Sequence, residues 1–76
     1  MTTKEFTKKI RTVVERQAKV GMTLELNGKT MMCIDTEESS YGTRYIFDSG
    51  VSFTKSNIVS NIVKCAEAGQ SWDFKF

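Results

Sequence analysis

The residues that could do chemistry are few and lie far apart in the sequence. There is no histidine, and the two cysteines, Cys33 and Cys65, form no C-x-x-C pair. Protein zinc sites draw mainly on these residue types at short spacings, and a serine or cysteine nucleophile usually relies on a histidine. We therefore expect no metal site. The cysteines are expected to be reduced, half-buried core residues, with a Cys33–Cys65 disulfide as the alternative.

Acid–base catalysis would require two carboxyl groups in one pocket with separated pKa values. Three candidates, Asp35, Glu37 and Glu38, fall within or beside one polar stretch, where solvation and turn formation explain them. Gly28 and Gly50 belong to predicted hairpins, and no glycine-rich phosphate-binding motif is present. The sequence therefore predicts no catalytic residue and no cofactor, and the protein is not expected to be an enzyme.

Positive charge is concentrated near the N-terminus. From Lys4 to Lys19 there are six basic and two acidic residues, so this segment carries +4 while the whole chain carries +2. In helical spacing Lys4, Lys8, Arg11 and Lys19 lie opposite the apolar residues. Such a face attracts nucleic-acid phosphates, although any amphipathic helix also needs a solvated outer face. Its apolar side has a core to cover, so no membrane partner is expected.

Aromatic residues provide a second set of candidate contacts. Tyr45 alternates with Arg44 in a predicted strand, so at least one of the two should be exposed, and Tyr45 could be a stacking platform. The C-terminal sequence SWDFKF places Trp72 and Phe74 on one side of an alternating segment. These aromatics either complete the core or offer an edge strand and hydrophobic anchors to a protein or to a second copy of the chain.

Two segments have the 3.6-residue period of a helix. The first spans 4–20, with Thr2 and Glu5 spaced as a capping box and Gly21 placed as a C-cap glycine. The second begins at Thr54 or Ser56 and extends to about residue 68.

Between and after the helices the apolar period is two, which is typical of strands. Asn27-Gly28 predicts a two-residue hairpin turn that pairs Leu24 with Met31. The expected segments are strand 22–26, strand 29–35, polar loop 36–42, strand 43–48, strand 51–53 and strand 71–76.

The predicted order is α-β-β-β-β-α-β. We expect a single α+β domain over residues 1–76, with a mostly antiparallel sheet or partial barrel packed by two helices. A chain of 76 residues is too short for a second core. No apolar stretch approaches the roughly 20 residues of a membrane helix, and no signal peptide is recognisable, so a cytoplasmic location is expected.

The segment RYIFDSGVSF, residues 44–53, consists of a strand, an F-x-x-G turn and a second strand. It resembles a pattern common in small accessory proteins of tailed bacteriophages, as do the start MTTKEF and the lack of proline and histidine. The resemblance implies a cytoplasmic binder, made during infection, that targets a host enzyme, a defence system or nucleic acid.

The function expected from the sequence is that of a non-catalytic binding module that contacts a protein partner, as an inhibitor or modulator. One alternative is a nucleic-acid binder that uses the basic face of the first helix. A second alternative is a structural or assembly subunit that forms homo-oligomers through its C-terminal strand.

Overall fold

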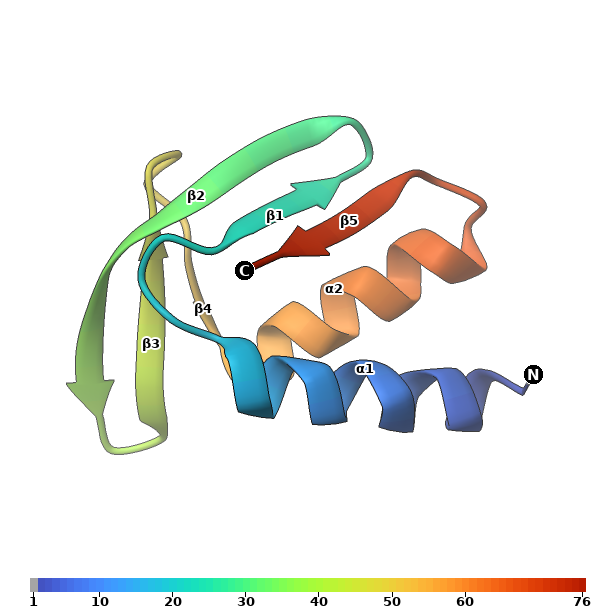
Figure 1. Cartoon of the computed structure of the whole chain (residues 1–76), viewed down its shortest axis with the longest axis horizontal. Coiled ribbons are helices and arrows are strands. Elements are labelled where there is room, and N and C mark those ends of the chain that lie inside the picture. Colours follow the sequence, from blue (N-terminus) through green and yellow to red (C-terminus); the bar gives the residue numbers. More distant parts are fainter. Residues whose placement is uncertain (1) are drawn as a thin grey trace.

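The computed structural model describes residues 2–76 and confirms the α+β class and the order α-β-β-β-β-α-β (Figure 1). Five antiparallel strands form one curled sheet in the order β4-β3-β2-β1-β5. The elements are α1 (Thr3–Gln17), β1 (Thr23–Leu26), β2 (Lys29–Ser39), β3 (Gly42–Phe47), β4 (Ser52–Thr54), α2 (Lys55–Glu67) and β5 (Trp72–Lys75).

Helix α1 begins as predicted but ends earlier. The Thr2 hydroxyl accepts a hydrogen bond from the Glu5 N–H at 3.2 Å and so caps the first turn. The predicted end at residue 20, with Gly21 as the cap, is wrong, because Ala18 is already extended. Gly21 instead has φ +97° and donates its N–H to the Cys33 carbonyl at 2.9 Å. It therefore directs the chain into the sheet.

The first hairpin has the predicted turn and register. Asn27 and Gly28 have φ values of 54° and 81°, and a type I′ turn requires a positive φ at both of these positions. Leu24 pairs with Met31, and the side chain of Leu24 is fully buried. Alternation along β1 therefore sends one set of side chains to the core and the other to the opposite face.

Strand β2 is longer than its residue types predict. The segment 36–42, expected to be a polar loop, is mostly β structure, since β2 continues to Ser39 and turns tightly into β3. The Ser39 hydroxyl donates to the Gly42 carbonyl at 2.7 Å across this turn. The opposite charges of Glu37 and Arg44 face each other in the ladder. Cross-strand partners thus override the low strand propensity of the segment.

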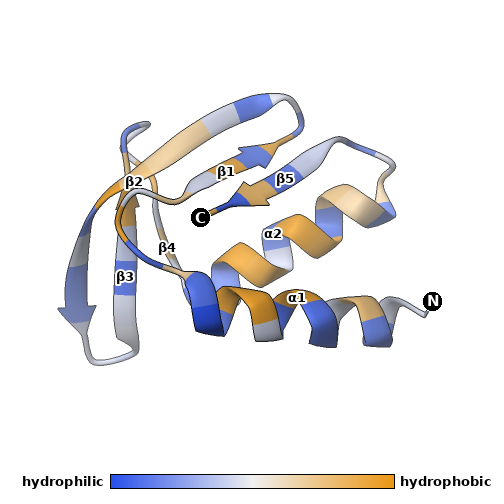
Figure 2. Ribbon diagram, viewed as in Figure 1, coloured by the Kyte–Doolittle hydropathy of each residue, from blue (hydrophilic) through white to orange (hydrophobic). Residues whose placement is uncertain are grey.

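Helix α2 packs against both the sheet and α1. Its N-cap Thr54 and Asn57 form a reciprocal capping box, with each side chain bonded to the backbone of the other residue. Strands β1, β3, β4 and β5 contact α2, and α1 packs mainly on the other side of α2. Figure 2 shows the hydrophobic parts of the two helices facing each other. The buried core consists of Val14, Met22, Leu24, Cys33, Tyr45, Phe47, Ile58, Val59 and Ile62.

Both cysteines are free core residues, as predicted, and they are more deeply buried than the half-buried position expected from the sequence. Among the described residues, no helix is both long and apolar enough to cross a membrane.

Candidate functional site

The predicted basic surface exists on α1, but it is shorter than expected. Lys4, Lys8 and Arg11 are exposed on the side of the helix that faces away from α2, and they share it with Glu15. Lys19 is also exposed, but it lies beyond the end of the helix in the connection to β1. The ion pair found within residues 2–76 joins Lys75 to Asp73 and involves no α1 residue.

The predicted aromatic contacts lie mainly in the core. Tyr45 is only 6% exposed, so its proposed role as a stacking platform is wrong. Its strand neighbour Arg44 is the exposed member of the pair and donates to the Ser52 hydroxyl at 3.0 Å. Trp72 and Phe74 are half-buried and pack against the core, which confirms the core alternative for the C-terminal strand.

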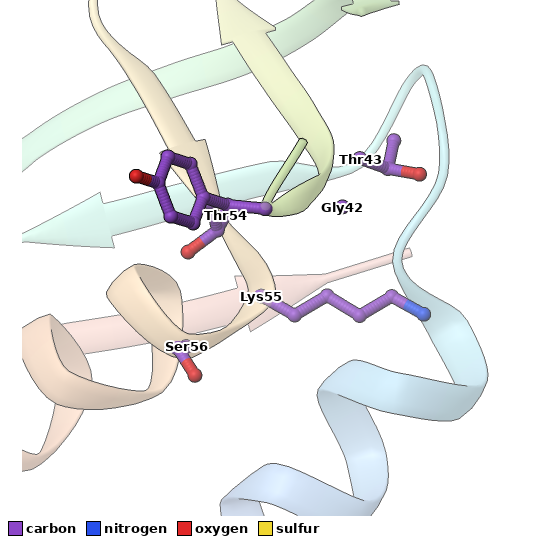
Figure 3. Close-up of a pocket in the computed structure, with 6 residues that line it drawn as sticks. Gly42, Thr43, Thr54, Lys55 and Ser56 are labelled. Atoms are coloured by element: carbon purple, nitrogen blue, oxygen red, sulfur yellow. The ribbon is translucent and has the colours of Figure 1, made fainter. Parts of the chain in front are cut away.

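A hollow of about 400 Å³ lies where the start of β3 meets the start of α2. Figure 3 shows that Lys55 points away from Ser56, toward the end of α1. Its ammonium group donates to the Glu15 carbonyl at 3.3 Å, and the Thr54 hydroxyl is already bonded to the Asn57 N–H. The cation and one of the hydroxyls that line the hollow thus already make hydrogen bonds within the fold.

The face of the sheet that points away from α2 has a different character. We call it the outer face. Cross-strand pairing places Thr23 between Met32 and Lys75 on this face, and Glu25 between Thr30 and Asp73. Among the side chains assigned to it by pairing and alternation are Thr23, Glu25, Thr30, Met32, Ile34, Asp35, Glu37, Arg44, Ile46, Asp73 and Lys75.

Two large apolar side chains are exposed at the centre of the outer face. Met32 is 43% exposed and Ile34 is 53% exposed, in the part of β2 that is coloured hydrophobic in Figure 2. The pairing of β2 with β3 shifts by one residue between Cys33 and Asp35, so Ile34 is the extra residue of a β-bulge. The half-buried Ile46 of β3 lies beside this bulge on the same face. We call Met32, Ile34 and Ile46 the apolar patch.

Acidic residues outnumber basic ones on the outer face that carries the apolar patch. The outer face carries Glu25, Asp35, Glu37 and Asp73, and the adjoining Asp48 accepts a hydrogen bond from the Met32 N–H at 3.2 Å. The only basic residues counted with these five carboxylates are Arg44 and Lys75, so the net charge of this group of seven residues is −3. The molecule therefore has a basic side on α1 and an acidic side, with an apolar centre, on the sheet.

Two buried groups, the Cys33 thiol and the Tyr45 phenol, have pKa values shifted toward their neutral forms. Burial raises the pKa of the Cys33 thiol, which also donates weakly to the Asp35 carbonyl at 3.3 Å, and burial likewise raises the pKa of the Tyr45 phenol. A raised pKa opposes formation of the thiolate, which is the nucleophilic form of cysteine. Within residues 2–76 there is no group of three or more cysteine or acidic side chains placed to hold a metal ion.

Sequence reasoning placed Met32 and Ile34 on a mixed face with Thr23 and Glu25 but did not select them as contact residues. The sequence did contain a signal for them. The register of the first hairpin puts two large apolar residues of β2 on the same face as a threonine and a glutamate of β1, and such a polar face is expected to be exposed. Comparison of the chain with protein-family models, curated proteins and solved structures gave no match.

Proposed function

We propose that this protein is a non-catalytic binding module that acts in the cytoplasm by contact with a protein partner, which it inhibits or modulates. The observation that carries the proposal is the exposure of Met32 and Ile34 side by side on the outer face of the sheet. Isolated exposed apolar residues are common, but grouped ones with a polar rim are typical of interaction surfaces. Here Ile46 extends the group and charged residues surround it.

The position of the patch in the fold supports this function. A β-bulge next to a binding site commonly redirects a side chain, and Ile34 occupies the extra position of the bulge in β2. The inner face of the same strand supplies Cys33 to the core, at 1% exposure. The outer residues are thus held on a backbone that the core fixes, which lowers the entropy lost on binding.

The test is affinity capture from the native cytoplasm with the tagged full chain. We expect Ile34→Glu to lose the partner that the wild type retains, because it removes the apolar contact at the centre of the patch and would bury a charge there. Phe76→Ala is the matched control, since it removes an exposed aromatic residue (54%) outside the patch. Circular dichroism should show that both variants are folded. Equal capture by wild type and Ile34→Glu would refute the proposal.

The basic face of α1 supports a second candidate function, nucleic-acid binding. Lys4, Lys8 and Arg11 are exposed and belong to no ion pair in the described part of the chain. Their charges are therefore free to neutralise phosphates. The acidic outer face would then lie away from the nucleic acid.

A further inference from the structure

Building on the proposed function, we propose that the segment of the partner protein that the outer face binds is basic and amphipathic, with apolar side chains for the patch and lysine or arginine around them. The charged residues that share the outer face with Met32 and Ile34 carry this proposal.

The two cations of the outer face have local partners. Lys75 forms an ion pair with Asp73 at 3.7 Å, and Arg44 donates to the Ser52 hydroxyl while standing opposite Glu37 in the ladder. Glu25 and Asp35 have no ion pair among residues 2–76. Two carboxylates near the apolar patch are thus left without a counter-charge, and a partner can supply it.

A second copy of the chain does not fit this surface. Two outer faces packed together would oppose one net charge of −3 with another. The cationic face of α1 has the right sign, but the apolar side chains of that helix, such as Ile10, pack against the core. A nucleic acid is also disfavoured here, because its phosphates would face carboxylates. The surface is complementary to a foreign segment that joins positive charge to exposed apolar groups.

The probes that test this inference are three labelled peptides of equal length, composed of Lys and Leu, of Glu and Leu, and of Lys and Ser. Fluorescence anisotropy with the full-length protein measures their binding. We expect the Lys/Leu peptide to bind most tightly and its affinity to fall with added salt, since exposed charges are screened. The Glu/Leu peptide offers the same apolar side chains with the opposite charge, and the Lys/Ser peptide offers the positive charge without apolar side chains.

The variant Glu25→Gln/Asp35→Asn removes the two carboxylates while keeping their shape. The asparagine also keeps an oxygen for the Thr36 N–H, which the Asp35 carboxylate binds at 2.8 Å. We expect about two- to tenfold weaker binding of the Lys/Leu peptide and a flatter salt dependence. Glu67→Gln, an exposed carboxylate at the end of α2, is the matched control and should bind as the wild type does.

The inference is overturned if the Lys/Leu peptide binds no better than the other two, or if the double variant binds it as the wild type does. These outcomes are distinct from failure of the proposed function. If capture of a partner depends on Ile34 but not on Glu25 and Asp35, the proposal of a binding module stands. The proposal that it prefers basic segments is then refuted.

Discussion

The ring of Phe6 in α1 meets the ring of Trp72 in β5 edge to face, with centroids 5.6 Å apart and planes inclined at 68°. The first helix and the last strand are thereby joined directly, although α1 otherwise packs mainly on α2. Edge-to-face pairs contribute about 0.5–1.5 kcal/mol beyond the area that they bury. In a chain of 76 residues, whose total stability is about 4–11 kcal/mol, that is a substantial share.

We therefore predict that Trp72→Ala destabilises the protein strongly. The expected loss is about 2–3 kcal/mol in the free energy of unfolding, less than the roughly 3–5 kcal/mol of a fully buried aromatic truncation, because the ring is only half-buried. Urea unfolding of wild type, Phe6→Ala, Trp72→Ala and the double variant gives the coupling between the two rings. We expect a coupling of about 0.5–1.5 kcal/mol. Strict additivity would show that the two rings stabilise the fold independently.

Signals that act over a few residues were sufficient to predict much of the fold. Asn27-Gly28 defines its turn because few residue pairs accept a positive φ at both positions. Thr2 and Thr54 cap the two helices because their hydroxyls reach a backbone N–H three residues ahead. In each case the determining interaction lies within the segment, so the sequence contains it.

The candidate site was harder to predict because exposure depends on which element covers a strand. Tyr45 and Met32 both lie in alternating segments, yet Tyr45 is 6% exposed and Met32 is 43% exposed. Which face of each strand meets α2 is decided by the curl of the sheet and by the bulge at Ile34. The extension of β2 to Ser39 likewise depends on pairing with β3 and not on the residues of β2 alone.

A second prediction concerns the free edge of β5. The backbone carbonyl of Ser71 accepts a hydrogen bond from the Asn27 N–H at 2.8 Å, so the backbone groups of residues 71, 73 and 75 face β1. The backbone N–H of Phe74, at an intervening position, therefore points away from β1 toward the free edge. The Asp73 carboxylate accepts the Phe74 N–H at 2.8 Å and so occupies this edge. Asp73→Ala should free the N–H, remove a charge and promote edge-to-edge association.

Sedimentation velocity over a range of concentrations measures this association. Asp73→Asn, which keeps an acceptor oxygen on the same side chain, is the matched control and should shift the distribution less. If Asp73→Ala sediments as the wild type does, the carboxylate does not protect the edge, and an assembly role through β5 loses its support.

The third prediction is a loss of stability in alkaline solution. Burial raises the pKa of Cys33 above its ordinary value of 9.0 and that of Tyr45 above 10.0. Both acids therefore ionise more readily in the unfolded chain than in the folded one. Their contribution to the free energy of unfolding is complete below the pKa values of the unfolded chain. It declines as the pH rises past those values, by up to about 1.4 kcal/mol per pH unit for each group.

Denaturant unfolding at intervals from pH 7 to pH 11 measures this decline. Tyr45→Phe should make the free energy of unfolding fall less steeply with pH above about pH 10, because it removes the buried phenol. The matched control Tyr41→Phe alters a phenol that is 88% exposed, and its curve should follow that of the wild type. A stability that stays constant across this range would contradict the assignment of Cys33 and Tyr45 to the core.

The last prediction concerns the basic face of α1. Lys8→Glu/Arg11→Glu reverses two exposed charges and leaves the apolar side of the helix as it is, so the protein should keep its fold and nearly all of its stability. If α1 binds nucleic acid, retention of the wild type on a DNA or RNA column at low salt should be abolished in this variant, because counterion release scales with the phosphates neutralised. Lys64→Glu, an exposed charge reversal on α2, serves as the control and should be retained in part. A wild type that is never retained at low salt, or a double variant that is retained equally, would remove nucleic acid as a partner and leave the acidic outer face of the sheet as the surface to pursue.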